Sequence, residues 1–157
     1  MKNDTDTNAA QLQDLIQILT DRVKIYTTAI SSIDANQDID LIALLENTMQ
    51  LSQQFKSELN GVLAKEDTAF SEREWTAGSL YTLWEAEKPS LEGLGREEVI
   101  KACKKMENAI QDVFQAILSH KSNYTENTAM MLKSQAALQQ EITQQINVAG
   151  SENKKGK

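Results

Sequence analysis

Two glutamates lie close to the apolar stripes of predicted helices, where they could bind a metal ion. Glu58 lies between Phe55 and Val62, and Glu107 follows Cys103 by one helical turn. A di-iron or di-manganese centre in a helical bundle takes a glutamate from each of two helices and a Glu-x-x-His pair from each of the other two. The chain has a single histidine, and no Glu-x-x-His occurs in it. A complete di-metal centre is therefore excluded, and a weaker iron or manganese site on Glu58 and Glu107 remains an alternative.

The same acids have a structural alternative, because an arginine falls on the core side of the first predicted helix. Arg22 lies between Leu19 and Tyr26 in an apolar stripe. A charge buried without a partner is very costly, so a mid-bundle arginine and mid-bundle acids should pair. We expect a buried polar network of Arg22, Tyr26, Glu58 and Glu107, with the Tyr26 hydroxyl as a further donor. In the competing interpretation, one or more of these side chains lies at the stripe edge and reaches water.

Oxygen-bearing side chains occupy every second position from 34 to 40, in the manner of the first half of a calcium loop: Asp34, Asn36, Asp38 and Asp40. Such a loop needs glycine at its sixth position and a glutamate at its twelfth. Those positions hold Ile39 and Leu45, so the turn and the strongest ligand are both missing. Asp38 is instead the predicted N-cap of the helix that follows.

The only cysteine and the only histidine do not form a nucleophile and base pair. Cys103 lies in an apolar stripe, and His120 lies more than four helical turns further along the same predicted helix. Buried free thiols usually behave as small apolar side chains, and a catalytic thiol needs a base beside it. A single cysteine also excludes an internal disulfide and a four-thiolate zinc site. We predict no catalytic residues, which favours a protein that is not an enzyme.

Apolar residues recur at spacings of three and four in four long stretches of the chain, which predicts amphipathic helices. These helices are expected over residues 8–34, 38–64, 96–120 and 124–148. Rods of about 25 residues, each about 37 Å long, bury narrow stripes by packing side by side as a four-helix bundle. We therefore predict an all-α fold with one domain over 8–148 and flexible tails at 1–7 and 149–157.

The connection between the second and third predicted helices, residues 65–95, is long enough to run the length of the bundle. It permits the ferritin-like arrangement with one long crossover. Ser71 and Glu74 resemble a capping box and predict that a short extra helix begins there and ends before Pro89. Four aromatic residues fall in this segment: Phe70, Trp75, Tyr81 and Trp84.

Those aromatic residues admit three interpretations. The segment could cover part of the bundle core, or its rings could form a subunit interface, because exposed aromatic patches favour association. A ligand lid is the third alternative. The interface interpretation predicts a homo-oligomer, most simply a dimer, that forms through the crossover.

Composition excludes several classes of partner. There are 16 Lys and Arg residues and 23 Asp and Glu residues, so the net charge is −7, which argues against nucleic-acid binding. The N-terminus is polar, and the longest apolar run, residues 41–45, is far shorter than the ~20 residues of a membrane helix. We expect a cytoplasmic protein with no transmembrane segment.

Several short motifs, taken together, indicate a family. They are Leu15-Ile16 with Asp21-Arg22, Tyr26 and Ala29; the run 54–59; Cys103 with Glu107-Asn108-Ala109; and Gly78-x-Leu80 with Trp84. Over residues 10–146 this combination resembles an uncharacterised bacterial ferritin-like family, the domain of unknown function 2383. The resemblance implies a ferritin-like four-helix bundle and no established activity.

The chain also departs from that family. Residues 25–27 read Ile-Tyr-Thr where the family tends to have Gly-Tyr-Glu, and residues 139–141 read Gln-Gln-Glu where it often has a histidine. If any relative binds a metal through those groups, this chain has lost them. The sequence favours a non-catalytic structural or interaction protein, and the alternative is an iron-binding or manganese-binding protein that uses Glu58 and Glu107. A membrane-surface protein is a third interpretation, but no Lys/Arg-rich face accompanies a large apolar one.

Overall fold

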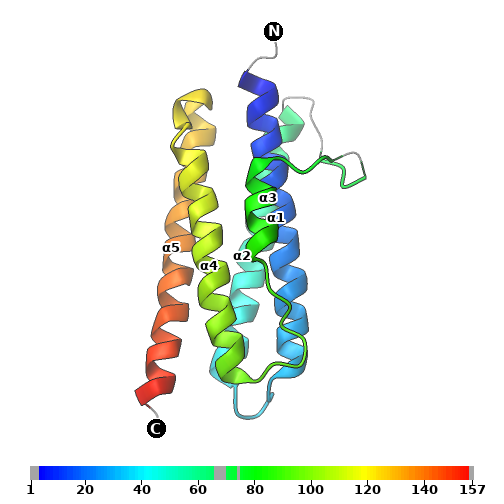
Figure 1. The fold of residues 1–157 in the computed structure, drawn as a ribbon. Helices are drawn as coiled ribbons and strands as arrows, with labels where there is room; N and C mark the ends of the chain where they lie inside the picture. The colour runs from blue at the N-terminus through cyan, green and yellow to red at the C-terminus, as the bar shows by residue number, and fades with distance from the viewer. Residues whose placement is uncertain (1–3, 66–69, 74, 156–157) are drawn as a thin grey trace.

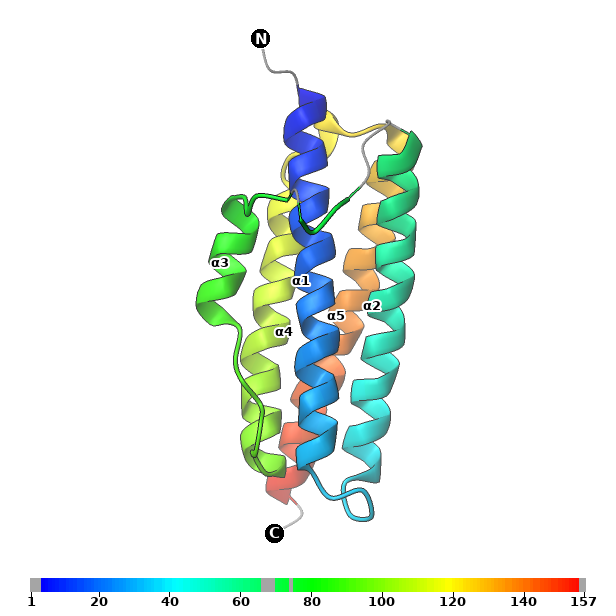
Figure 2. The ribbon, with the colours of Figure 1, turned by 90° about the vertical axis from the view of Figure 1, so that its right-hand side faces the viewer.

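The computed structural model describes the backbone of residues 4–65, 70–73 and 75–155, and every regular element in these ranges is helical. Four long helices lie side by side, and a short helix lies against the outside of two of them (Figures 1 and 2). The elements are α1 (Asp4–Ser32), α2 (Ile39–Lys65), α3 (Ser79–Glu87), α4 (Arg96–Leu118), the 3₁₀ turn η1 (Lys121–Asn123) and α5 (Glu126–Lys155). The described residues contain no strand, so the predicted all-α class is confirmed.

The chain crosses the length of the bundle once, between α2 and α4. Arg96, the first residue of α4, donates to Asp38 Oδ1 at 3.1 Å and to Asp40 Oδ2 at 2.8 Å. α4 therefore starts beside the turn that joins α1 to α2, and it runs in the same direction as α2 (Figure 1). α1 and α5 run in the opposite direction. Each of α1 and α5 packs against both α2 and α4, so the helices in the order α1, α2, α5, α4 form a four-sided arrangement.

The core is a single apolar cluster to which all four long helices contribute. Within this cluster the rings of Phe55 on α2 and Phe114 on α4 meet edge to face, with centroids 6.2 Å apart. Leu15 and Leu19 of α1 belong to the same cluster and are fully buried. Each such side chain contributes about 1.5–3 kcal/mol on burial. The predicted apolar stripes therefore hold the bundle together.

Both ends of the bundle extend further than the sequence pattern predicts. α1 begins at Asp4, and α5 continues to Lys155, so helix occupies most of the segments that were expected to be tails. Residues 1–3 and 156–157 lie outside the described part. No helix in the described ranges combines the length and the apolar character that crossing a membrane requires.

Two helix starts differ from the predicted ones. The last long helix was expected from residue 124, directly after Asn123, but Thr125 caps α5: its Oγ1 accepts from Thr128 N at 3.2 Å, and its carbonyl accepts from Ala129 N at 2.8 Å. α3 begins at Ser79, so the expected helix start at Ser71 is wrong, and its partner Glu74 lies outside the described residues. The backbone before Ser79 is extended because a carboxylate of α1 holds it, as described below.

Candidate functional site

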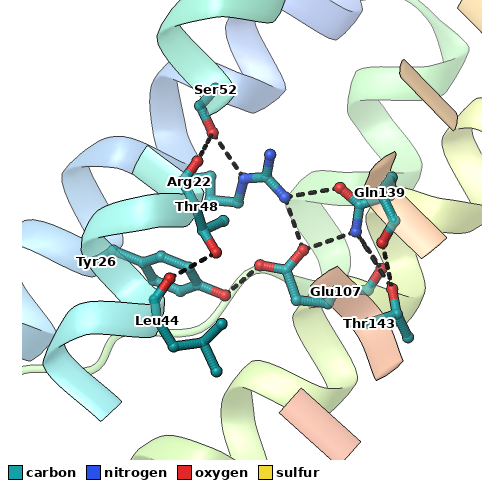
Figure 3. Close-up of polar contacts among 8 residues, drawn as sticks. All are labelled: Arg22, Tyr26, Leu44, Thr48, Ser52, Glu107, Gln139 and Thr143. Atoms are coloured by element: carbon teal, nitrogen blue, oxygen red, sulfur yellow. Dashed lines mark hydrogen bonds and ion pairs between the residues drawn. The ribbon is translucent and has the colours of Figure 1, made fainter. Parts of the chain in front are cut away.

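Arg22 lies at the centre of the bundle with its side chain fully buried. Its Nη1 donates to Glu107 Oε1 at 2.7 Å and to Gln139 Oε1 at 2.8 Å (Figure 3). Its Nε donates to Ser52 Oγ at 2.9 Å. One arginine of α1 therefore binds a polar side chain from each of the other three long helices.

The carboxylate of Glu107 is engaged at both oxygens. Oε1 accepts from Arg22 and, at 2.8 Å, from Gln139 Nε2, while Oε2 accepts from the hydroxyl of Tyr26. Burial, together with the neighbouring Cys103 and Glu107, raises the pKa of Tyr26 well above its ordinary value. The Tyr26 hydroxyl therefore keeps its proton and remains a donor to this carboxylate.

We call Arg22, Tyr26, Ser52, Glu107 and Gln139 the core cluster. All five residues are buried, and two of them also bond to a residue four positions away on their own helix. Ser52 Oγ donates to the Thr48 carbonyl at 3.0 Å, and Gln139 Nε2 is 3.3 Å from Thr143 Oγ1. Among the described residues, the one donor of the cluster without a partner is Arg22 Nη2.

The spacing of residues in the sequence indicates that Ser52 and Gln139 are buried. Along α5, Gln135 and Gln139 complete the spacing of three and four between Leu132 and Ile142. On α2, Ser52 likewise fills the stripe position ahead of Phe55, and both Ser52 and Gln139 are fully buried. A polar residue that fills an apolar stripe position predicts a buried hydrogen bond, because an unpaired group there is costly.

The structure does not place Glu58 in the core cluster, so its predicted membership of the buried network is corrected. Glu58 is half-buried, and its Oε1 accepts from Gln135 Nε2 at 2.8 Å. It lies six residues beyond Ser52 on α2, which is about 9 Å along the helix axis. This offset places Glu58 nearer the C-terminal end of α2 than the level at which Arg22 meets Glu107, at the seam between α2 and α5.

The residues present do not fit a di-metal centre of the kind found in ferritin-like bundles. Both oxygens of Glu107 already accept hydrogen bonds, and one donor is a guanidinium whose positive charge would repel a metal cation. Glu58 is engaged at a different level. Within the described ranges, no group of three or more His, Cys, Asp or Glu side chains is arranged to hold a metal ion. The buried cation beside Glu107 is therefore a protein side chain.

The calcium-like run forms a helix-connecting turn. Asp34 Oδ1 accepts from the backbone N–H of Asn36 and Gln37. Asp38 and Asp40 instead face Arg96, and hydrogen bonding to this guanidinium lowers the pKa of Asp40. These carboxylates anchor the start of α4 beside the α1–α2 turn.

Cys103 and His120 lie apart, as their spacing predicts. Burial raises the pKa of Cys103 to about 12, so the thiol is protonated at neutral pH and is a poor nucleophile. His120 is exposed just beyond α4, where its Nδ1 lies 3.3 Å from the Ala116 carbonyl. Neither residue activates the other.

A second set of carboxylates, which the sequence reasoning missed, attaches the crossover to α1. Asp14 Oδ1 accepts from Trp75 Nε1 and from Gly78 N, each at 3.0 Å, and Oδ2 accepts from Tyr81 N at 3.1 Å. One carboxylate thus satisfies two of the backbone donors at the start of α3, which an exposed helix end would otherwise leave to water.

Asp21 binds the other end of α3. Its Oδ2 accepts from Tyr81 Oη at 2.5 Å, Trp84 Nε1 at 3.1 Å and Lys88 Nζ at 3.2 Å. Burial acts to raise the pKa of this carboxyl, but hydrogen bonds from Tyr81, Trp84, Gln17 and Lys88 outweigh it and lower the pKa. Asp21 is therefore ionised at neutral pH and holds α3 in place.

The aromatic residues of the crossover pack against their own chain. Trp84 is 1% exposed and Tyr81 is 6% exposed, and Phe70 and Trp75 are half-buried. The Trp75 and Tyr81 rings meet edge to face with centroids 4.7 Å apart. This placement matches the interpretation that the segment covers the core, and it removes Tyr81 and Trp84 from the surface that a partner could reach.

The sequence did contain a signal for the two carboxylates that hold the crossover. Asp14 and Asp21 are seven residues apart, so they lie on one face of α1.

Comparison with known proteins identifies no family. No family model matches the chain, and none of the curated proteins is significantly similar to it. Function therefore has to be inferred from the geometry of the core cluster and of the surface around it.

Proposed function

We propose that this chain is a ferritin-like four-helix bundle with a non-catalytic structural or interaction role. The single long crossover between α2 and α4, which leaves α2 and α4 parallel, supports the ferritin-like assignment. So does the resemblance of the sequence motifs to the bacterial ferritin-like family with domain of unknown function 2383. A cytoplasmic location accords with a single cysteine that is buried and unpaired.

The observation that carries the non-catalytic assignment is that the core cluster is buried and out of reach of a substrate. A catalytic centre needs a group that can reach substrate, and every member of this cluster is buried. Glu107 has no free oxygen, because Arg22, Tyr26 and Gln139 occupy both of them. The described clefts of the molecule lie outside the bundle centre, and none is lined by Arg22 or Glu107.

The core cluster instead has a structural use. Its hydrogen bonds join all four long helices at one level, so they form together in one axial alignment only. A buried polar group that is satisfied in one arrangement selects that arrangement over other ways of packing amphipathic helices. We therefore assign the cluster the role of fixing the helix register.

Metal binding through Glu58 and Glu107 is the alternative function. It would require Glu107 to exchange its guanidinium and hydroxyl partners for a metal ion, and Glu58 to move from the edge of the bundle to its centre. The Glu58 carboxylate is held away from that position by Gln135. No observed contact favours this alternative.

Metal analysis of protein purified without a histidine tag tests the proposal. We expect neither iron nor manganese near one equivalent per chain after loading and desalting, and we expect Glu107→Gln and Glu58→Gln to leave the metal content unchanged. Iron or manganese near stoichiometry in the wild type, lost in either variant, would overturn the non-catalytic assignment. The same substitution at an exposed acid outside both sites, Glu46→Gln, is the matched control.

A further inference from the structure

An open groove lies at the seam between α2 and α5, near the C-terminal end of α2. Its volume is about 530 Å³, and apolar atoms make up most of its walls. Val62 of α2 and Met131 of α5 lie along it, and Met130 next to them is 59% exposed. α3 packs against α1 and α4, so it leaves this α2–α5 groove uncovered (Figure 2).

A glycine lies on the α2 wall of this groove. A Cβ built on Gly61 would meet none of the described residues within 4 Å, and the Gly61 backbone is helical. Glycine is among the least favourable residues in a helix, and neither a turn nor a neighbouring atom of the described residues requires it at this position. Among the described residues, nothing therefore blocks a close approach to the backbone of α2 at Gly61.

One acidic and one basic residue flank Gly61, so two antiparallel copies of this segment have complementary charges. Glu58 lies three residues before Gly61 and Lys65 lies four residues after it, and both line the groove. Lys65 is exposed and forms no ion pair with the described residues. If a second α2 crossed antiparallel at residues 61 and 62, Glu58 of each copy would face Lys65 of the other.

From this arrangement we propose that a second copy of this chain packs antiparallel against the α2–α5 groove. The two copies cross at Gly61, bury Val62 and Met131 between them, and form two symmetry-related pairs between Glu58 and Lys65. Such a contact is isologous, so it closes at two copies. The inference deepens the proposed interaction role and rests on it, and it places the interface away from the crossover aromatics.

A groove on another face of the bundle does not have this property. It lies between α3 and α4, has a volume of about 260 Å³ and carries the exposed Leu83. The charged residues that line it, Glu87 and Asp112, are both acidic. Two copies brought together there would place like charges against each other, which opposes association.

Charge exchange tests the proposed pairing directly. Glu58→Lys leaves two positive residues on each copy, and Lys65→Glu leaves two negative ones. Each variant should weaken self-association by at least about tenfold, because like charges then meet at both ends of the contact. A mixture of the two variants restores both pairs, so it should form a heterodimer near the wild-type affinity. The double variant should recover the homodimer.

Steric blocking at the crossing gives an independent readout. The Cβ of Gly61→Leu has no described atom within 4 Å, and Gly61 lies on an exposed part of α2, so the monomer should fold with unchanged circular dichroism, while the dimer is lost. The matched control is Ala43→Leu, an exposed alanine on the same helix five turns away. That variant should remain a dimer with the wild-type dissociation constant.

Sedimentation equilibrium over a wide concentration range measures all of these proteins. The proposal is supported by a wild-type dimer that Gly61→Leu and the single charge variants dissociate and that mixing restores. It is overturned by a wild-type chain that stays monomeric throughout, by dimers that survive Gly61→Leu, or by a mixture that stays monomeric. Metal content measured on the same samples separates the two proposals: a metal-loaded dimer that dissociates as described would overturn the non-catalytic role and leave this interface standing.

Discussion

Removing one member of the buried ion pair should cost the bundle a large part of its stability. Arg22 and Glu107 are both fully buried and 2.7 Å apart. Breaking a buried pair by removing one partner typically costs about 3–5 kcal/mol, because the other charge is left uncompensated. We expect Arg22→Met and Glu107→Leu each to lose this amount, out of a total stability on the order of 5–15 kcal/mol.

Removing both charges together should cost much less than the sum of the two losses. Two single losses of about 4 kcal/mol each would add to about 8 kcal/mol, whereas apolar replacement of a whole buried pair is often neutral. In the double variant the Tyr26 hydroxyl loses its acceptor on Glu107, which should leave a loss of about 1–3 kcal/mol. Adding Tyr26→Phe removes that donor and should recover part of this loss, while Gln139 Oε1, which accepts from Arg22 in the wild type, still lacks its donor.

Urea unfolding followed by circular dichroism measures this series. With a urea dependence of roughly 2 kcal/mol per molar, a loss of about 4 kcal/mol lowers the midpoint by about 2 M. The surface pair of Lys105 and Glu87, 3.8 Å apart and well exposed, is the control, and its removal should change stability by less than about 1 kcal/mol. Single core variants as mild as this control, or a double variant as unstable as the sum, would refute a compensated charge pair at the centre of the bundle.

Three further predictions concern the attachment of α3 and the buried thiol. Gly78→Ala should destabilise the protein by about 1–3 kcal/mol, because its Cβ would lie 2.6 Å from Asp14 Oδ2. Gly95→Ala is the control: Gly95 is likewise an N-cap, but its Cβ would meet no described atom within 4 Å, so it should cost less than about 1 kcal/mol in the same thermal melts. The pKa of Asp21 is lower in the folded chain than in the unfolded chain. The contribution of Asp21 to the free energy of unfolding is therefore complete at neutral pH and is lost as the pH falls below about 4. Asp21→Asn should remove this part of the acid unfolding transition, followed by tryptophan fluorescence, and an unchanged transition would contradict the prediction. Cys103, with its pKa raised to about 12 by burial, should react with a thiol reagent at neutral pH only as fast as the protein opens, so rapid labelling of the folded protein would show that the thiol is accessible.

The helices themselves could be predicted because apolar spacing depends only on helix geometry. The ends were harder, since neighbouring residues compete to form the cap. Asn123 and Thr125 are both suitable N-caps by residue type, but Asn123 is still part of the 3₁₀ turn η1, where its backbone N–H donates to the His120 carbonyl. Thr125 then remains to cap α5. The start of α3 was missed for a tertiary reason, because Asp14 holds the preceding backbone in an extended form.

The core cluster could be predicted in part. A buried arginine requires a carboxylate, which pointed to Glu58 and Glu107 together. The choice between them depends on the axial offset of α2 against α4, and no pattern within a single helix specifies that offset. Ser52 and Gln139 are uncharged, so they are noticed only when the stripe positions they fill are followed residue by residue.

Apolar stripes make four helices pack, but they permit more than one alignment, whereas the polar contacts of α1 are satisfied in a single one. Arg22 and Asp21 are neighbours in sequence and point about 100° apart around the helix, so Arg22 reaches the bundle centre while Asp21 reaches α3. A slip of α4 by one turn, about 5.4 Å, would carry Glu107 out of reach of Arg22 and leave two charges buried without partners. The same slip would shift the start of α4 away from Asp38 and Asp40, which hold Arg96 beside the α1–α2 turn. Misalignment would thus break contacts at the centre and at one end of the bundle together, which is why a core of interchangeable apolar residues still selects one register.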